Sequence, residues 1–139
     1  MKTLVIYYSY TGSTKAMAEK KARKLKADII EVTELKKRSK FSAYTMGCLA
    51  AMKRKRAQIT GIDADLSPYE HIIVAAPIWS GYPAPPFNNI VDHLPAGAQV
   101  DVYLSSASGE TLKSAKGTKE MITAQGCRLA KYVDVKTGA

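Results

Sequence analysis

LVIYYSYTGST, residues 4–14, joins an apolar run to a turn rich in hydroxyl side chains. The apolar run is typical of a buried strand, and the lysine- and alanine-rich segment after the turn is typical of a helix. A strand-to-helix turn presents backbone N–H groups and the positive end of the helix dipole at one point. Gly12 lets a ligand approach the backbone closely. This pattern suits binding of a phosphate monoester, and it suits a serine/threonine-rich helix cap without a ligand equally well.

No lysine lies within the turn, and it lacks the Gly-Lys-Ser/Thr ending of a nucleoside triphosphate loop. The turn resembles the phosphate loop of flavodoxins, Thr/Ser-x-Thr-Gly-x-Thr, at every patterned position. The resemblance implies flavin mononucleotide (FMN) as the cofactor, with its 5′-phosphate held by this first loop. The residues of the first loop are Ser9, Tyr10, Thr11, Gly12, Ser13 and Thr14.

The chain alternates predicted strands and helices, which indicates an α/β fold with a parallel sheet covered on both faces. We predict strands over 2–8, 28–32, 71–76, 100–104 and 129–135, and helices over 13–26, within 41–52, over 85–94 and over 111–124. In the last helix, Leu112, Ala115 and Ile122 are expected to face the sheet. The resemblance implies a flavodoxin-like three-layer sandwich with the strand order 2-1-3-4-5. In that order the loops after the first, third and fourth long strands meet at one crevice.

The second loop follows the third long strand and contains two large aromatic residues, Trp79 and Tyr82. Such rings can stack on a planar heterocycle and exclude water, or can simply pack in the core. The loop also resembles the second flavin loop of flavodoxin-like proteins, where the tryptophan contacts the flavin ring. Its residues are Pro77, Ile78, Trp79, Ser80, Gly81 and Tyr82.

The third loop has only small residues where the best-known flavodoxins place an acid and an aromatic residue. It resembles the Ser/Thr-Ser-Gly loops of shorter, reductase-like relatives, whose backbone N–H groups could hold the pyrimidine edge of the flavin. Its residues are Ser105, Ser106, Ala107, Ser108 and Gly109.

Length and composition predict one domain, residues 1–139, without a signal peptide or a membrane span, and therefore a cytoplasmic protein. Cys48 and Cys127 are far apart, and neither His71 nor His93 has a neighbouring ligand pattern, so we predict no metal site. The three loops contain no obvious acid, base or nucleophile, so we assign no catalytic residue. We therefore favour an FMN-dependent electron carrier over a small NAD(P)H-dependent FMN or quinone reductase. The sequence also contains no Gly-x-Gly-x-x-Gly motif, which is the fingerprint of a nicotinamide dinucleotide site.

Positive charge is concentrated in the first part of the chain. Residues 1–56 contain 15 Lys/Arg and 4 Asp/Glu, whereas residues 57–139 contain 6 and 8. Such a surface attracts anionic partners, and we expect an acidic redox partner protein; a solvated face or a basic docking module is the alternative. Only Phe41 and Tyr44 interleave with the basic cluster, so nucleic acid is not favoured. The eight residues of the cluster are Lys36, Lys37, Arg38, Lys40, Lys53, Arg54, Lys55 and Arg56.

The sequence lacks the C-terminal fifth helix of flavodoxins, because it ends four residues after Val135. Without that helix we expect apolar strand residues to be open to water and to form the interface of a homodimer. The residues expected there are Ile72, Val74, Val102 and Leu104. A tail beyond residue 139, or the 41–52 segment folded over this face, is the alternative.

Overall fold

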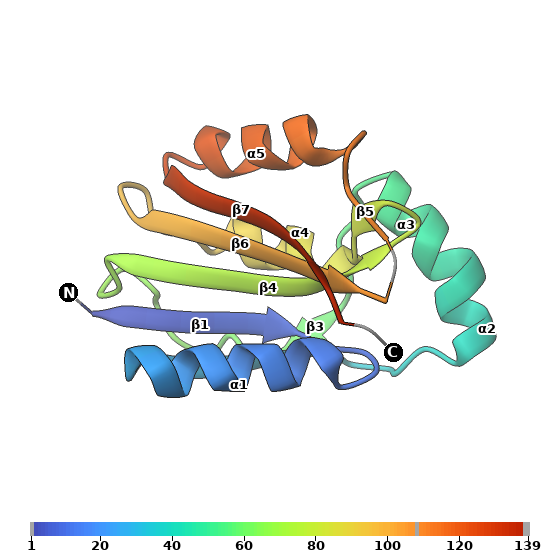
Figure 1. Cartoon of the computed structure of the whole chain (residues 1–139), viewed down its shortest axis with the longest axis horizontal. Coiled ribbons are helices and arrows are strands. Elements are labelled where there is room, and N and C mark those ends of the chain that lie inside the picture. Colours follow the sequence, from blue (N-terminus) through green and yellow to red (C-terminus); the bar gives the residue numbers. More distant parts are fainter. Residues whose placement is uncertain (1, 108, 138–139) are drawn as a thin grey trace.

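The computed structural model describes residues 2–107 and 109–137, in which five long parallel strands form the sheet (Figure 1). The order β2-β1-β4-β6-β7 confirms the predicted 2-1-3-4-5 arrangement. Two short strands, β3 (Ile59–Thr60) and β5 (Tyr82–Pro83), were not predicted because two residues show no periodicity; they pair antiparallel with β2 and β4. The long elements are β1 (Thr3–Tyr8), α1 (Ser13–Leu25), β2 (Asp28–Glu34), β4 (His71–Trp79), α4 (Pro85–Asp92), β6 (Gln99–Ser106), α5 (Ala115–Ala124) and β7 (Arg128–Lys136).

Alternation along the strands divides the core into two layers. On one face, Ala18 and Ala22 of α1 pack against Val5 and Ile73. On the other face, α4 and α5 cover a larger apolar layer. That layer includes Ile72, Val74, Phe87, Ile90, Val102, Leu104 and Ile122, all fully buried.

The prediction of an open apolar patch was therefore wrong for all four residues named for it. The register pairs Ile72 with Val100 and Val74 with Val102, which places these side chains under α4 and α5 rather than on the α1 face. Near β7 the α1 face carries Val133, which is 37% exposed, and Tyr103, whose ring lies 3.8 Å from the Lys21 Nζ. The homodimer was predicted because this apolar patch was expected to be exposed, and the burial of the patch removes that reason.

The start of the last helix also differs from the prediction. The helix begins at Ala115 rather than near residue 111, and Leu112 is 78% exposed instead of facing the sheet. Thr111 is fully buried, donates its hydroxyl to Asp134 (2.6 Å) and accepts the backbone N–H groups of Ser114 and Ala115. These bonds hold residues 111–114 in a turn, so Leu112 points outward, whereas Ile122 is fully buried as predicted.

A helical segment over residues 40–52 lies at the carboxyl ends of the strands, away from both helix layers (Figure 1). It consists of α2 (Lys40–Ser42), the π-helical turn η1 (Ala43–Gly47) and α3 (Cys48–Met52), in agreement with the short helix predicted within 41–52. Because it lies at the strand ends, it does not cover the face that a fifth helix would occupy. None of the helices in the described part of the chain is both long and apolar enough to cross a membrane.

Candidate functional site

The first loop gives α1 an open N-terminus. Gly12 adopts a left-handed conformation (φ 104°) as the N-cap, and its N–H donates to the Ser9 Oγ (3.1 Å). Within the described residues, no side chain caps α1. The N–H groups of a first helical turn have no partner inside the helix, so here they can bind an anion.

A buried hydroxyl pair joins the first loop to the third. The Thr14 Oγ1 lies 2.8 Å from the Ser105 Oγ, and both residues are about 2% exposed. Ser106 uses its Oγ to accept the N–H of Gly109 (2.5 Å). Thr14 therefore fixes the position of the loops, while Thr11 is exposed.

The second loop is shorter than predicted, because Pro77, Ile78 and Trp79 belong to β4. Trp79 pairs with Tyr82 of β5 across a two-residue turn, in which Ser80 (φ 54°) and Gly81 (φ 82°) both have positive φ. Positive φ at both central residues is the signature of a type I′ hairpin turn. The loop is thus a tight hairpin that holds Trp79 at the end of the central strand.

A cavity of about 590 Å³ lies between the first loop, the β4–β5 hairpin and the helical segment. We call it the Trp79 cavity. Three aromatic residues, two aliphatic hydroxyl residues, one lysine and one cysteine contribute to its wall. The described residues that line it are Tyr10, Thr11, Lys40, Ala43, Tyr44, Cys48, Ile78, Trp79 and Ser80.

The indole of Trp79 is held on several sides. Tyr8 and Tyr10 contact it edge-on, with ring centroids 6.1 and 5.7 Å away, and the Arg38 guanidinium lies 6.0 Å from its ring centre. Gly47 of the helical segment lies so close that a Cβ there would be 2.8 Å from the indole Cζ3. The segment can pack against the tryptophan only because residue 47 has no side chain.

A hydrogen-bonded network anchors the chain after β2 beside this indole. Tyr8 donates its hydroxyl to the Glu34 Oε1 (2.8 Å), and the Arg38 Nε donates to the Glu34 Oε2 (3.0 Å). Tyr10 donates to the Arg38 carbonyl (2.7 Å). Burial, and then the Glu34 carboxylate, raise the pKa of Tyr8 far above its usual value, so it stays a neutral donor.

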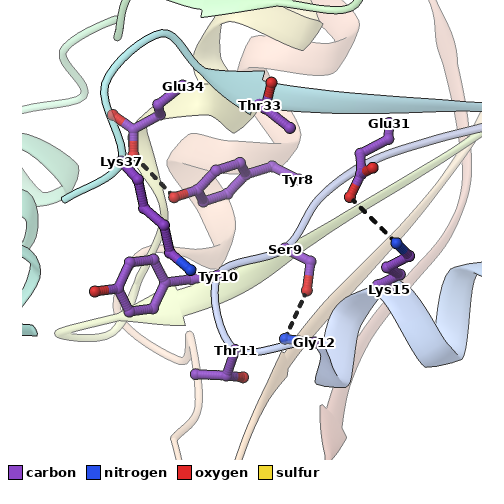
Figure 2. Close-up of a pocket in the computed structure, with 10 residues that line it drawn as sticks. All are labelled: Tyr8, Ser9, Tyr10, Thr11, Gly12, Lys15, Glu31, Thr33, Glu34 and Lys37. Carbon is purple, nitrogen blue, oxygen red and sulfur yellow. Dashed lines mark hydrogen bonds and ion pairs between the residues drawn. The ribbon is translucent and has the colours of Figure 1, made fainter. Parts of the chain in front are cut away.

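A second cavity, of about 360 Å³, lies on the other side of the first loop, between it and the end of β2 (Figure 2). Lys15 lies 4.0 Å from Glu31 at one side of it. Tyr10 and Thr11 line both cavities, so the first loop separates them. Thr11 is thus reachable from either side, whereas Gly12 and Lys15 at the start of α1 line only the second cavity.

Two groups of predicted site residues lie away from the Trp79 cavity. Tyr82 lines a separate cavity of about 300 Å³ with Glu110 and Leu112, and the Arg54 guanidinium lies 5.2 Å from its ring centre. In the third loop Ser105 bonds to Thr14 of the first loop, but none of the described residues of the third loop lines the Trp79 cavity. Those residues are Ser105, Ser106, Ala107 and Gly109. Ser108 lies outside the described residues.

The sequence reasoning missed the wall that the helical segment contributes, which includes Lys40, Tyr44 and Cys48. The aromatic and small residues of this segment can be seen in the sequence. No periodicity in the sequence, however, indicates that the segment folds back across the strand ends. Burial raises the pKa of the Cys48 thiol above its usual value, so the thiol is neutral near pH 7 and a weak nucleophile.

Three members of the basic cluster have structural partners. Arg38 binds Glu34, Arg56 makes a two-pronged ion pair with Asp92 (both 2.8 Å), and Arg54 donates to Thr118 and the Ser114 carbonyl (both 3.0 Å). The pKa of Asp92 is lowered by its hydrogen bonds from Arg56. The lysines of the cluster, by contrast, are all exposed. Those lysines are Lys36, Lys37, Lys40, Lys53 and Lys55.

The fold and the three loops at the strand ends define a flavodoxin-like α/β protein. A flavoprotein from Lactobacillus acidophilus in complex with FMN is similar over 96% of this chain and 92% of its own, with 25% identity and a TM-score of 0.80. Flavodoxin 1 from Bacillus cereus matches 98% of this chain and 86% of its own, with 17% identity and a TM-score of 0.53.

An NADH:FMN oxidoreductase is similar over 99% of this chain and 76% of its own, with 15% identity and a TM-score of 0.62. At such identities the last two matches show the fold alone. No protein-family model matches the chain, and no curated protein matches its sequence. The comparisons confirm the predicted resemblance to flavodoxin-like flavoproteins, and FMN is present in the complex from Lactobacillus acidophilus.

Proposed function

We propose that the chain binds FMN and passes electrons as a carrier. The observation that supports this most is that Thr11, which directly precedes the N-cap Gly12, lines the Trp79 cavity, so the open N-terminus of α1 lies beside that cavity. The helix start suits a phosphate dianion, and the aromatic wall suits a planar ring. FMN carries both groups on one molecule, and the similar flavoprotein from Lactobacillus acidophilus is complexed with it.

The roles follow from position. The N–H groups of the first turn of α1 and the exposed hydroxyl of Thr11 would hold the phosphate, with Lys15 adding positive charge. Trp79, fixed by Gly47 and the tyrosines, would pack against the ring and exclude water. Thr14 and Ser105 would hold the first and third loops together.

Carrier chemistry is favoured by the residues that line the Trp79 cavity. The described lining contains no carboxylate and no imidazole, and its one thiol has a raised pKa. The protein therefore offers few groups to exchange protons with a substrate, whereas bound FMN itself accepts and donates electrons. A small NAD(P)H-dependent reductase, the alternative from the sequence, would oxidise NADH once loaded with FMN; a carrier would not.

The phosphate assignment is tested by comparing FMN with riboflavin, which lacks only the phosphate. Affinity for FMN, measured by quenching of flavin fluorescence, should exceed that for riboflavin by tenfold or more, because hydrogen bonds to a charged group contribute about 1.5–3 kcal/mol each. Thr11→Ala, which removes one of these bonds, should weaken FMN binding about tenfold or more and leave riboflavin binding unchanged. Thr123→Ala, which removes an exposed hydroxyl on α5, is the matched control. Equal affinity for the two flavins would reject the phosphate site.

A further inference from the structure

We propose that the outer face of the helical segment 40–52 docks onto an anionic lipid surface. Large apolar side chains project from this face into solvent. Phe41 is 78% exposed, Tyr44 79%, Met46 62%, Leu49 45% and Met52 47%. Surface apolar residues are normally scattered singly, and a group of this size on one short segment marks an interaction site.

The inner face of the same segment explains why these side chains cannot turn inward. Ala43, Gly47 and Ala51 are buried, and they are spaced one helical turn apart. Gly47 already touches the indole of Trp79, so no larger side chain fits between the segment and the cavity wall. The packing therefore places the small residues on the face of the segment that contacts the protein, and the large apolar residues on its solvent-exposed face.

Positive charge surrounds the apolar face at both ends. Lys36, Lys37 and Lys40 are exposed before it, and Lys53 and Lys55 after it. The sequence contains no Asp or Glu from residue 35 to residue 62. Apolar side chains on one face with lysines beside them are typical of a helix that lies in a membrane interface, where the amines reach anionic headgroups.

A lipid surface fits this face better than a second copy of the chain or an acidic protein. A twofold dimer brings the same patch of both copies together, so the lysines of one copy would face those of the other. The apolar side chains project from a single convex helix, which would require a matching recess in a protein partner. A bilayer offers negative charge and apolar depth together and needs no complementary shape. Lys40 and Tyr44 also line the Trp79 cavity, so a docked chain would hold that cavity at the membrane surface.

Co-sedimentation of the full chain with vesicles tests the proposal without any flavin, so its outcome is independent of the proposed function. We expect binding to phosphatidylcholine vesicles that contain phosphatidylglycerol and no binding to phosphatidylcholine alone, with loss of binding at high salt because exposed charges are screened. Phe41→Ser/Met46→Ser/Leu49→Ser should weaken binding roughly tenfold or more. All three side chains are exposed, so the fold should survive, which far-ultraviolet circular dichroism checks.

Two controls separate this face from the rest of the surface. Leu25→Ser/Leu112→Ser removes exposed apolar side chains elsewhere, and Lys20→Gln/Lys24→Gln removes exposed charges on α1; neither should matter. The proposal is overturned if anionic vesicles do not bind the chain, or if the controls lose binding as much as the triple variant. It is equally overturned if sedimentation shows a dimer that the triple variant abolishes, or if an acidic protein occupies this face and vesicles do not.

Discussion

Replacing Gly47 by alanine should disturb Trp79 while leaving the rest of the helical segment intact. The new Cβ would lie 2.8 Å from the indole Cζ3 and 3.2 Å from Cε3, about 0.6 Å short of ordinary van der Waals contact. Tyr8, Tyr10 and Arg38 restrict the indole, so the movement that remains open to it is into the Trp79 cavity that it lines. Overpacking of this kind costs about 1–3 kcal/mol, and the better helix propensity of alanine returns up to about 1 kcal/mol.

The expected result is a free energy of unfolding lower by roughly 0–2 kcal/mol, measured by urea titration, together with weaker FMN binding. A double-mutant cycle with Trp79→Phe provides the control, because phenylalanine lacks the distal indole ring that the Cβ would meet. In the Trp79→Phe background, Gly47→Ala should be neutral or stabilising. If Gly47→Ala changes stability equally in both backgrounds, the close contact between the segment and the indole does not exist.

Two further predictions concern stability. Thr111→Val should lower the free energy of unfolding by about 1–3 kcal/mol, because it removes the buried hydroxyl that bonds to the Asp134 Oδ1 and to the Tyr132 hydroxyl, while the backbone N–H of residue 111 still donates to the Asp134 Oδ2. Thr123→Val on the surface of α5 should change it little, and similar effects of both would contradict this role. Stability should also fall between pH 10 and pH 12, since burial and then Glu31 raise the pKa of Tyr7 to about 12 and the unfolded chain releases this proton first. Tyr7→Phe should make this loss shallower in urea titrations across the same range, and an unchanged slope would contradict the assignment.

The sheet could be predicted because its signals are local and repeated. Continuous apolar runs and a helix after almost every strand leave few topologies, and the first-loop motif selects one of them. The prediction failed where it assigned strand residues to one face of the sheet. Ile72 and Val74 lie in a continuous apolar run, and such a run is compatible with either face of a buried sheet. In a strand that is apolar on both faces the alternation is invisible, so the prediction of a patch had no means of choosing the correct set.

The sequence motifs indicated which loops form the candidate site, but they did not indicate which other residues line its cavity or hold the loops together. The hydrogen bond between Thr14 and Ser105 joins residues that are 91 positions apart, and no sequence pattern in either loop predicts it. The role of Arg54 was likewise invisible: within a run of basic residues it looks like surface charge, yet it bonds to Thr118 and Ser114 of the turn and helix beyond. Long-range partners of this kind depend on where a helical segment folds back, which tertiary packing decides.

The segment 40–52 connects the two proposals through one structural constraint. A wall for the Trp79 cavity needs close approach, and close approach needs small residues at 43, 47 and 51. Because only small residues of the segment face the protein, the segment buries little apolar surface there. Its large apolar side chains point away from the core and are not buried by it. Those side chains remain exposed in this structure, where they would cost solubility unless something covers them. If the Phe41→Ser/Met46→Ser/Leu49→Ser variant binds FMN as the original chain does but no longer binds anionic vesicles, the two faces of the segment have separate functions.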